Sequence, residues 1–172
     1  MEDIRKQIAV YIDGHRDAMI DFWRQLVQIE SGSANKAGVD AVAHRVQEEL
    51  DTIGAHTEIH EMKRAGNMLV SVLNEDVPEA PVLLLGHMDT VFPDGTVAAR
   101  PFTLRDGKAY GPGVLDMKGG IIITLYVIKA LEAAGYKDRP IRICFCGDEE
   151  AGKFHAYACE QFQKWADGCI AG

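Results

Sequence analysis

Residues 82–87 read Val82-Leu83-Leu84-Leu85-Gly86-His87, and this stretch decides the expected fold. Four consecutive apolar residues are typical of a central strand buried on both faces, since a strand with one solvent-exposed face alternates apolar and polar residues. A second apolar run, from Ile141 to Phe145, predicts another buried strand. Residues 117–134, between the two, predict an apolar helix. The order of strand, helix and strand indicates an α/β domain.

Further helices and strands are predicted on either side of this centre. Apolar residues at three- and four-residue steps predict helices, and short stretches of strand-forming residues between turn signals predict strands. The other predicted helices are residues 4–29, 39–50 and about 153–165. The other predicted strands are residues 57–62, residues 68–73, the two halves of a hairpin at 103–110, and a strand that begins at 169. This order predicts a three-layer α/β/α domain with a mostly parallel or mixed sheet.

Length and composition limit the kind of protein. A chain of 172 residues with 47% apolar and 26% charged residues is suited to one globular domain. Its formal net charge of -8 argues against non-specific nucleic-acid binding, because the phosphate backbone repels an acidic surface. The first residues lack the pattern of a secretory signal, and no apolar run has membrane-spanning length. We therefore expect a soluble, cytoplasmic protein without nucleic-acid or membrane partners.

Three short segments carry residues suited to chemistry, and each follows a strand or precedes a helix. They are Gly86-His87-Met88-Asp89-Thr90, Leu115-Asp116-Met117-Lys118-Gly119-Gly120 and Gly147-Asp148-Glu149-Glu150. In open α/β sheets, functional sites form where loops leave the carboxyl ends of strands. Imidazole and carboxylate groups are the ligands that zinc uses in hydrolytic sites. Together the three segments predict a metal site.

The first two segments are ambiguous when each is taken alone. His87 and Asp89 are two residues apart at a strand end, so Asp89 can accept the ring N–H of His87, as partners of metal-bound histidines commonly do. A strand-end histidine beside a solvated aspartate fits that segment equally well. Asp116 alone is more typical of a residue that caps the free backbone N–H groups of the following helix.

The adjacent carboxylates Glu149 and Glu150 come directly after a buried strand, where they repel each other unless a cation or solvent screens them. At a metal centre one of them can bind metal while its neighbour takes a proton from the attacking water. This division of roles is that of a hydrolase. The alternative for the pair alone is a solvated acidic turn.

The order and spacing of these segments resemble the zinc exopeptidase family of aminoacylases, acetylornithine deacetylase and succinyl-diaminopimelate desuccinylase. The resemblance rests on the three segments together with Pro101-Phe102 and with residues 106–114, Asp-Gly-Lys-Ala-Tyr-Gly-Pro-Gly-Val. The Tyr-Gly-Pro-Gly form at 110–113 is most similar to the glutamate carboxypeptidase branch, carboxypeptidase G. The resemblance extends from about Phe22 to the last residue.

This resemblance implies the fold of a zinc-exopeptidase catalytic domain and a role for each site residue. His87 would bind one zinc, Asp116 would bridge two zincs, and Glu150 would bind the second. Glu149 would be the general base, and Asp89 would orient His87. The expected cofactors are two zinc ions, with cobalt as an alternative metal. A cis peptide is also expected directly after Asp116.

The resemblance further implies residues that this sequence does not contain. The family supplies another carboxylate ligand from a Glu-Pro segment just after the strand beginning at 169, and the sequence stops at Gly172, one residue before that point. A later histidine ligand is also missing, as is an inserted lid domain that binds substrate carboxylate and forms a homodimer. We expect residues 1–172 to be the N-terminal part of a catalytic domain and to be inactive alone. His155 is an additional candidate ligand, in a segment that departs from the family pattern.

The leading functional hypothesis is a di-zinc metallopeptidase that hydrolyses a peptide or amide bond next to a free carboxylate, with a small peptide as substrate. The first alternative is an N-acyl amino acid deacylase of the same family, because the missing lid domain selects the substrate. The alternative from another class is a non-catalytic metal-binding or assembly fragment.

Overall fold

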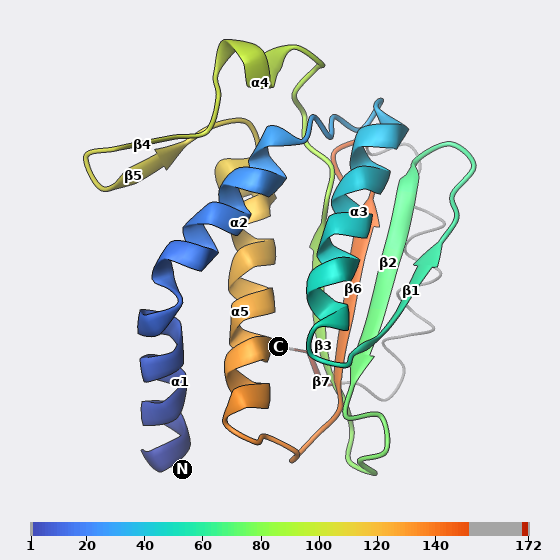
Figure 1. Cartoon of the computed structure of the whole chain (residues 1–172). Coiled ribbons are helices and arrows are strands. Elements are labelled where there is room, and N and C mark those ends of the chain that lie inside the picture. The colour runs from blue at the N-terminus through green and yellow to red at the C-terminus, as the bar shows by residue number, and fades with distance from the viewer. Residues whose placement is uncertain (1, 152–169, 172) are drawn as a thin grey trace.

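The structure is a computed structural model that describes residues 2–151 and 170–171 (Figure 1). Its helices are α1 (Glu2–Gly14), α2 (Arg16–Gln28), α3 (Lys36–Asp51), α4 (Thr96–Ala99), the π-helical turn η1 (Val114–Gly119) and α5 (Gly120–Ala133). Its strands are β1 (His56–His60), β2 (Gly66–Leu73), β3 (Val82–His87), β4 (Thr103–Arg105), β5 (Lys108–Tyr110), β6 (Ile141–Gly147) and β7 (Ile170–Ala171). None of the helices in these two ranges has the length and hydropathy needed to cross a membrane.

The main sheet has five strands in the order β1-β2-β6-β3-β7. Strand β3 pairs in parallel with β6 and β7, whereas β2 pairs antiparallel with β1 and β6. The sheet is therefore mixed, as the sequence predicts. Strands β4 and β5 form the hairpin predicted at residues 103–110, which projects away from the main sheet (Figure 1).

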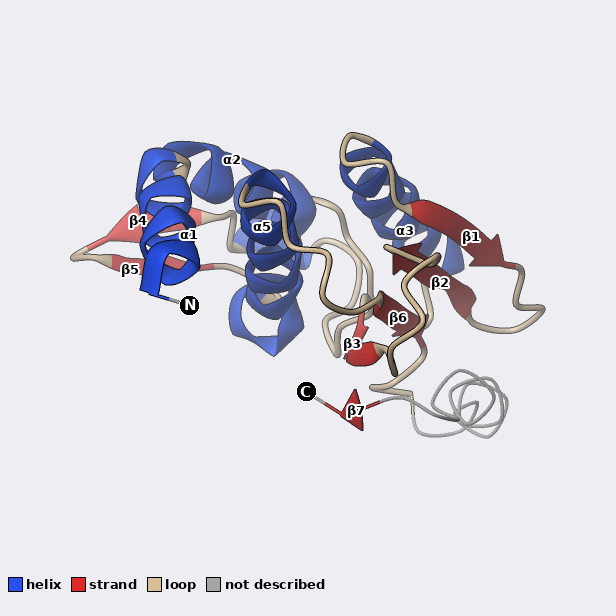
Figure 2. Cartoon of the chain, turned by 90° about the horizontal axis from the view of Figure 1, so that it is seen from below, coloured by secondary structure: helices blue, strands red, loops and turns tan. Residues whose placement is uncertain are grey.

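The main hydrophobic core lies between one face of the sheet and the helices α2, α3 and α5 (Figure 2). Alternate strand residues point to opposite faces, so Leu69 and Phe145 pack in this core, whereas Val70 and Cys144 belong to a smaller buried cluster. The described residues confirm the α/β class and the mixed sheet. The helix predicted at 153–165, which would supply the third layer, lies outside them.

The structure corrects two predicted helices. The helix predicted over residues 4–29 is two helices, because Gly14 ends α1 and His15 leaves the helical conformation with φ −109° and ψ 12°. Residues 117–119 of the helix predicted over 117–134 belong instead to η1, in which Asp116 has non-helical angles of φ −113° and ψ 102°. The regular helix α5 begins only after this turn. Asp116 therefore lies on an irregular segment rather than next to the first turn of a helix.

Burial is uneven along the central strand β3, in which only Leu83 and His87 are buried. Leu83 is 5% exposed, but Leu85 is 54% exposed. The prediction of a fully buried strand is wrong at Leu85, because β7 pairs with β3 only at Val82 and Leu83 and no described element covers the Leu85 side chain. Leu85, two residues before the buried His87, is thus the most exposed residue of β3.

The start of α3 packs so closely on Glu30 that Gly38 has no room for a side chain. A Cβ atom at Gly38 would lie 1.7 Å from the backbone oxygen of Glu30. We expect Gly38→Ala to lower the free energy of unfolding by about 3 kcal/mol, because backbone must move to relieve the overlap. Gly14→Ala is the matched control, since no atom lies within 4 Å of a Cβ added there. Urea unfolding compares the two variants, and equal stabilities would contradict this account of the packing.

Candidate metal centre

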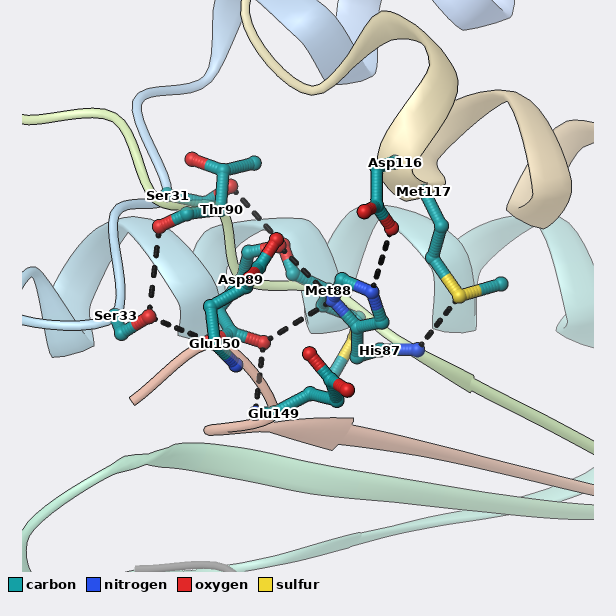
Figure 3. A network of polar contacts seen from close by, with 10 residues as sticks. All are labelled: Ser31, Ser33, His87, Met88, Asp89, Thr90, Asp116, Met117, Glu149 and Glu150. Carbon is teal, nitrogen blue, oxygen red and sulfur yellow. Dashed lines mark hydrogen bonds and ion pairs between the residues drawn. The ribbon is translucent and has the colours of Figure 1, made fainter. Parts of the chain in front are cut away.

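The carboxyl ends of β3 and β6 lie side by side and carry the predicted site residues. His87, the last residue of β3, pairs with Cys146, so Glu149 and Glu150 follow β6 at the same edge of the sheet. The turn η1 brings Asp116 to this edge (Figure 3). One ligand atom each from His87, Asp116 and Glu150 lie within 4.8 Å of one another. The structure therefore groups the three predicted metal ligands.

Asp89 is fully buried next to this group, and each of its carboxylate oxygens has two polar contacts. Oδ1 accepts a hydrogen bond of 3.1 Å from the backbone N–H of Glu149 and lies 3.3 Å from Nδ1 of His87. Oδ2 accepts bonds of 2.6 Å from the Ser33 hydroxyl and 3.0 Å from the backbone N–H of Glu150. Burial alone would raise the pKa of Asp89, but the bonds from His87 and Ser33 lower it. The residue expected to orient His87 thus also contacts the backbone of both glutamates.

The His87 ring lies between two carboxylates. Its Nδ1 faces Asp89, and its Nε2 is 3.1 Å from Oδ1 of Asp116. Figure 3 shows Asp116 and Glu149 on different sides of the ring. The Asp116 side chain does not cap α5, which has no side-chain cap, and the peptide between Asp116 and Met117 is cis, as the resemblance implies. Nε2 is therefore the His87 nitrogen that faces the group of ligands.

Negative charge is concentrated at this group. Burial raises the pKa of Glu150, and the nearby Asp116 carboxylate raises it further. Burial alone would lower the pKa of His87, but Asp89 and Asp116 raise it to about 9. A bound cation would relieve the repulsion among the carboxylates and would take the place of the proton on His87. One imidazole and two carboxylates are a donor set that fits zinc.

Lys118, which the sequence did not identify as a site residue, holds η1 against α2. Its side chain is buried, and Nζ donates to the backbone oxygens of Leu26 at 2.8 Å and Ile29 at 2.7 Å. Trp23 Nε1 adds a bond of 3.1 Å to the backbone oxygen of Val114. Burial lowers the pKa of Lys118 to about 7. Nothing in the local pattern identifies its partners, which are 92 and 89 residues away.

Two serines in Ser31-Gly32-Ser33 also contact the site. From the sequence, this segment was predicted only to separate two helices. Ser31 Oγ donates to the backbone oxygen of Met88 at 3.0 Å, and Ser33 Oγ donates to Asp89. Nothing in the local pattern identifies their partners, which are 57 and 56 residues away. His155, the additional candidate ligand, lies outside the described residues.

Two hollows flank the ligand group, and Glu150, Val91 and Phe92 line both. The larger has a volume of about 460 Å³ and extends past Ser33, and the smaller has a volume of about 330 Å³ and extends past Asp116. A small molecule can therefore approach the group from either side.

Comparison with known sequences gives a family match and curated relatives. The profile of peptidase family M20/M25/M40 matches residues 83–168. Carboxypeptidase G2 of Pseudomonas sp. (strain RS-16) is 34% identical over 143 residues, which are 80% of this chain and 34% of that protein. Acetylornithine deacetylase of Pectobacterium atrosepticum is 30% identical over 161 residues, which are 89% of this chain and 42% of that protein. The chain thus spans less than half the length of these relatives.

Solved structures share the fold. Human carnosine dipeptidase 1 matches 96% of this chain with a TM-score of 0.82 and 22% identity, and the match covers 40% of that protein chain. The dipeptidase Dug1p of Saccharomyces cerevisiae matches 95% of this chain with a TM-score of 0.79 and 21% identity, over 38% of its own chain. At these identities the likeness establishes the fold alone.

In the metal-free chain, His87 should make stability depend on pH. Its folded-state pKa of about 9 lies above the ordinary value of 6.5, so the protonated ring stabilises the fold below pH 6.5, and this contribution is lost as the pH rises through 9. The shift corresponds to about 3 kcal/mol. We expect the difference in unfolding free energy between the wild type and His87→Gln, in chelator, to shrink by this amount between pH 6 and 10.

The comparison cancels titrating groups away from His87, such as Lys118, and leaves His87 together with the two carboxyl groups whose pKa it lowers, Asp89 and Glu150. Urea unfolding at a series of pH values gives the difference directly. A constant difference across the range would show that His87 is not held by Asp89 and Asp116 in the folded protein.

Proposed function

The chain belongs to peptidase family M20/M25/M40, and from this premise we propose that it carries metal-binding and catalytic residues of a di-zinc hydrolase. The proposed reaction is hydrolysis of a peptide or amide bond next to a free carboxylate. One observation carries the proposal: ligand atoms of His87, Asp116 and Glu150 lie within 4.8 Å of one another, and Glu149 is adjacent in the chain.

The ligand roles follow from the donor atoms. His87, through Nε2, and Asp116 would hold the first zinc, and Asp116 together with Glu150 would hold the second. The mutual repulsion of the carboxylates, which raises the pKa of Glu150, supports a cation at this place. Zinc, when bound, polarises the scissile carbonyl and lowers the pKa of the attacking water. Cobalt is the alternative metal.

Glu149 is the proposed general base. Its backbone N–H donates to the buried Asp89 carboxylate, which fixes the position of the residue, while its side chain is exposed at the ligand group. Glu149 would accept a proton from the attacking water and deliver it to the leaving amine nitrogen. Asp89, in contact with Nδ1 of His87, would keep Nε2 directed toward the metal.

Two substrate classes fit the proposed reaction. We place a glutamate-carboxypeptidase-like reaction first, because carboxypeptidase G2 is 34% identical to the chain over 143 residues and because Tyr-Gly-Pro-Gly at 110–113 resembles the glutamate carboxypeptidase branch. An N-acyl amino acid deacylase is the second candidate, supported by acetylornithine deacetylase at 30% identity. Assays of the intact enzyme with peptides ending in glutamate and with N-acyl amino acids distinguish the two.

We also propose that these residues are the N-terminal part of a longer cytoplasmic enzyme, whose lid domain forms a homodimer. The relatives support this, since the chain covers 34% and 42% of their lengths. Exposed apolar side chains support it too: Leu115 is 87% exposed, Ile123 62% and Leu85 54%. Strand β7 runs parallel to β3, so a continuation of that strand would extend toward His87, where the resemblance implies another carboxylate ligand.

The metal content of the 172-residue chain tests the centre and its completeness. We expect the chain to bind zinc with fewer than two ions per chain and to lack turnover, because its described residues supply only three ligands. His87→Ala should abolish this binding. Equilibrium dialysis followed by metal analysis measures both. A chain that binds no zinc would contradict the metal centre, and one that binds two ions tightly would contradict its incompleteness.

Substitution of each neighbouring glutamate in the intact enzyme should distinguish the role of Glu149 from that of Glu150. We expect Glu149→Ala to retain metal while kcat falls by about 10³-fold, since the proton acceptor is removed. Glu150→Ala, the matched variant, should lose metal because it removes a ligand. Steady-state kinetics and metal analysis of both variants are the measurements. Full activity of Glu149→Ala, or activity of the wild type that survives a chelator, would rule out the proposed mechanism.

A further inference from the structure

Ser33 makes the shortest polar contact to the Asp89 carboxylate. Its hydroxyl donates to Oδ2 at 2.6 Å, whereas the other contacts to this carboxylate are between 3.0 and 3.3 Å. Because Asp89 is fully buried, each donor that it loses leaves charge without compensation from solvent. Without the Ser33 hydroxyl, the backbone N–H of Glu150 would be the one donor left to Oδ2 among residues 2–151 and 170–171.

The backbone around Ser33 is held in place independently of its side chain. Residues 31–33 lie alongside Thr90: the Ser33 N–H donates to the Thr90 oxygen at 3.1 Å, and the Thr90 N–H donates to the Ser31 oxygen at 2.8 Å. Gly32 sits so close that a Cβ there would lie 2.4 Å from the backbone oxygen of Phe92. The Ser33 hydroxyl is therefore presented to Asp89 by a fixed segment.

We propose that Ser33 is a positioning residue of the metal centre, which acts through the Asp89 carboxylate. By holding Oδ2, Ser33 fixes the rotation of that carboxylate. Oδ1 then meets Nδ1 of His87 and the Glu149 N–H while Oδ2 meets the Glu150 N–H. The hydroxyl thus acts on the N–H groups of both glutamates and on the carboxylate contact to His87 Nδ1, a nitrogen that also lies 3.1 Å from the backbone oxygen of Asp89. The inference rests on the proposed metal-dependent function and adds to it a residue outside the ligand group.

Three variants of the 172-residue chain test this role. Ser33→Ala removes the hydroxyl, and Ser33→Thr keeps it. Ser31→Ala is the matched control, because it removes a serine bond of 3.0 Å from the same segment without touching Asp89. Zinc affinity is measured by titration, and the cobalt absorption spectrum reports the ligand arrangement. Amide hydrogen exchange of Glu149 and Glu150 is followed in the metal-free protein.

We expect Ser33→Ala to weaken zinc binding about tenfold, the lower end of the effect of removing groups that orient metal ligands, and to change the cobalt spectrum. Exchange at the Glu149 and Glu150 amides should become about tenfold faster, because the Asp89 carboxylate that accepts their hydrogen bonds is no longer held by Ser33. Ser33→Thr should restore all three properties, and Ser31→Ala should leave them unchanged even where it lowers thermal stability.

Several results would overturn the role of Ser33. Wild-type exchange at both amides in Ser33→Ala would do so whether or not the chain binds metal. Equal effects of Ser31→Ala and Ser33→Ala on zinc affinity would reduce Ser33 to a packing residue. By contrast, a wild-type chain that binds no zinc, with the expected exchange pattern intact, would refute the proposed metal function and support the positioning of Asp89 by Ser33.

Discussion

The buried carboxylate of Asp89 is the constraint on which the site depends. A fully buried carboxylate is costly unless several donors surround it, and here the donors come from three separate segments of the chain. Ser33 follows α2, His87 ends β3, and the two glutamates follow β6. The hydrogen bonds that stabilise the buried Asp89 carboxylate therefore bring together groups that are far apart in the sequence. The Asp89 carboxylate thus helps to position the proposed metal ligands even without a bound metal ion.

The fold places the segments that carry the site residues next to one another. Parallel pairing of β3 with β6 places His87 opposite Cys146, so the loops after the two strands share one edge. The turn η1 interrupts the path into α5 and directs Asp116 toward that edge, while buried Lys118 ties the turn to the end of α2. Each of these features is a backbone arrangement fixed by packing. The site is accordingly supported by rigid elements on three sides, with open hollows beside Glu150.

The sequence predicts the features that depend on local pattern, and it misses those that depend on distant contacts. Apolar runs identify β3 and β6, and residue chemistry at their ends identifies His87 and the paired glutamates. Ser33 and Lys118 could not be predicted, because their partners lie 56 and 92 residues away. Leu85 continues an apolar run but is exposed, since covering elements and not the run itself decide burial. Likewise, helical periodicity continues across His15 although the backbone breaks there.

The central claim is that a metal binds at the meeting point of β3, η1 and the loop after β6. Anomalous X-ray diffraction from crystals of the zinc-loaded protein tests it most directly. We predict an anomalous peak at about 2.0–2.2 Å from His87 Nε2 and at a similar distance from an Asp116 carboxylate oxygen. A peak at Cys144 and Cys146, or at the exposed His56 and the half-buried His60, with none at His87, would contradict it.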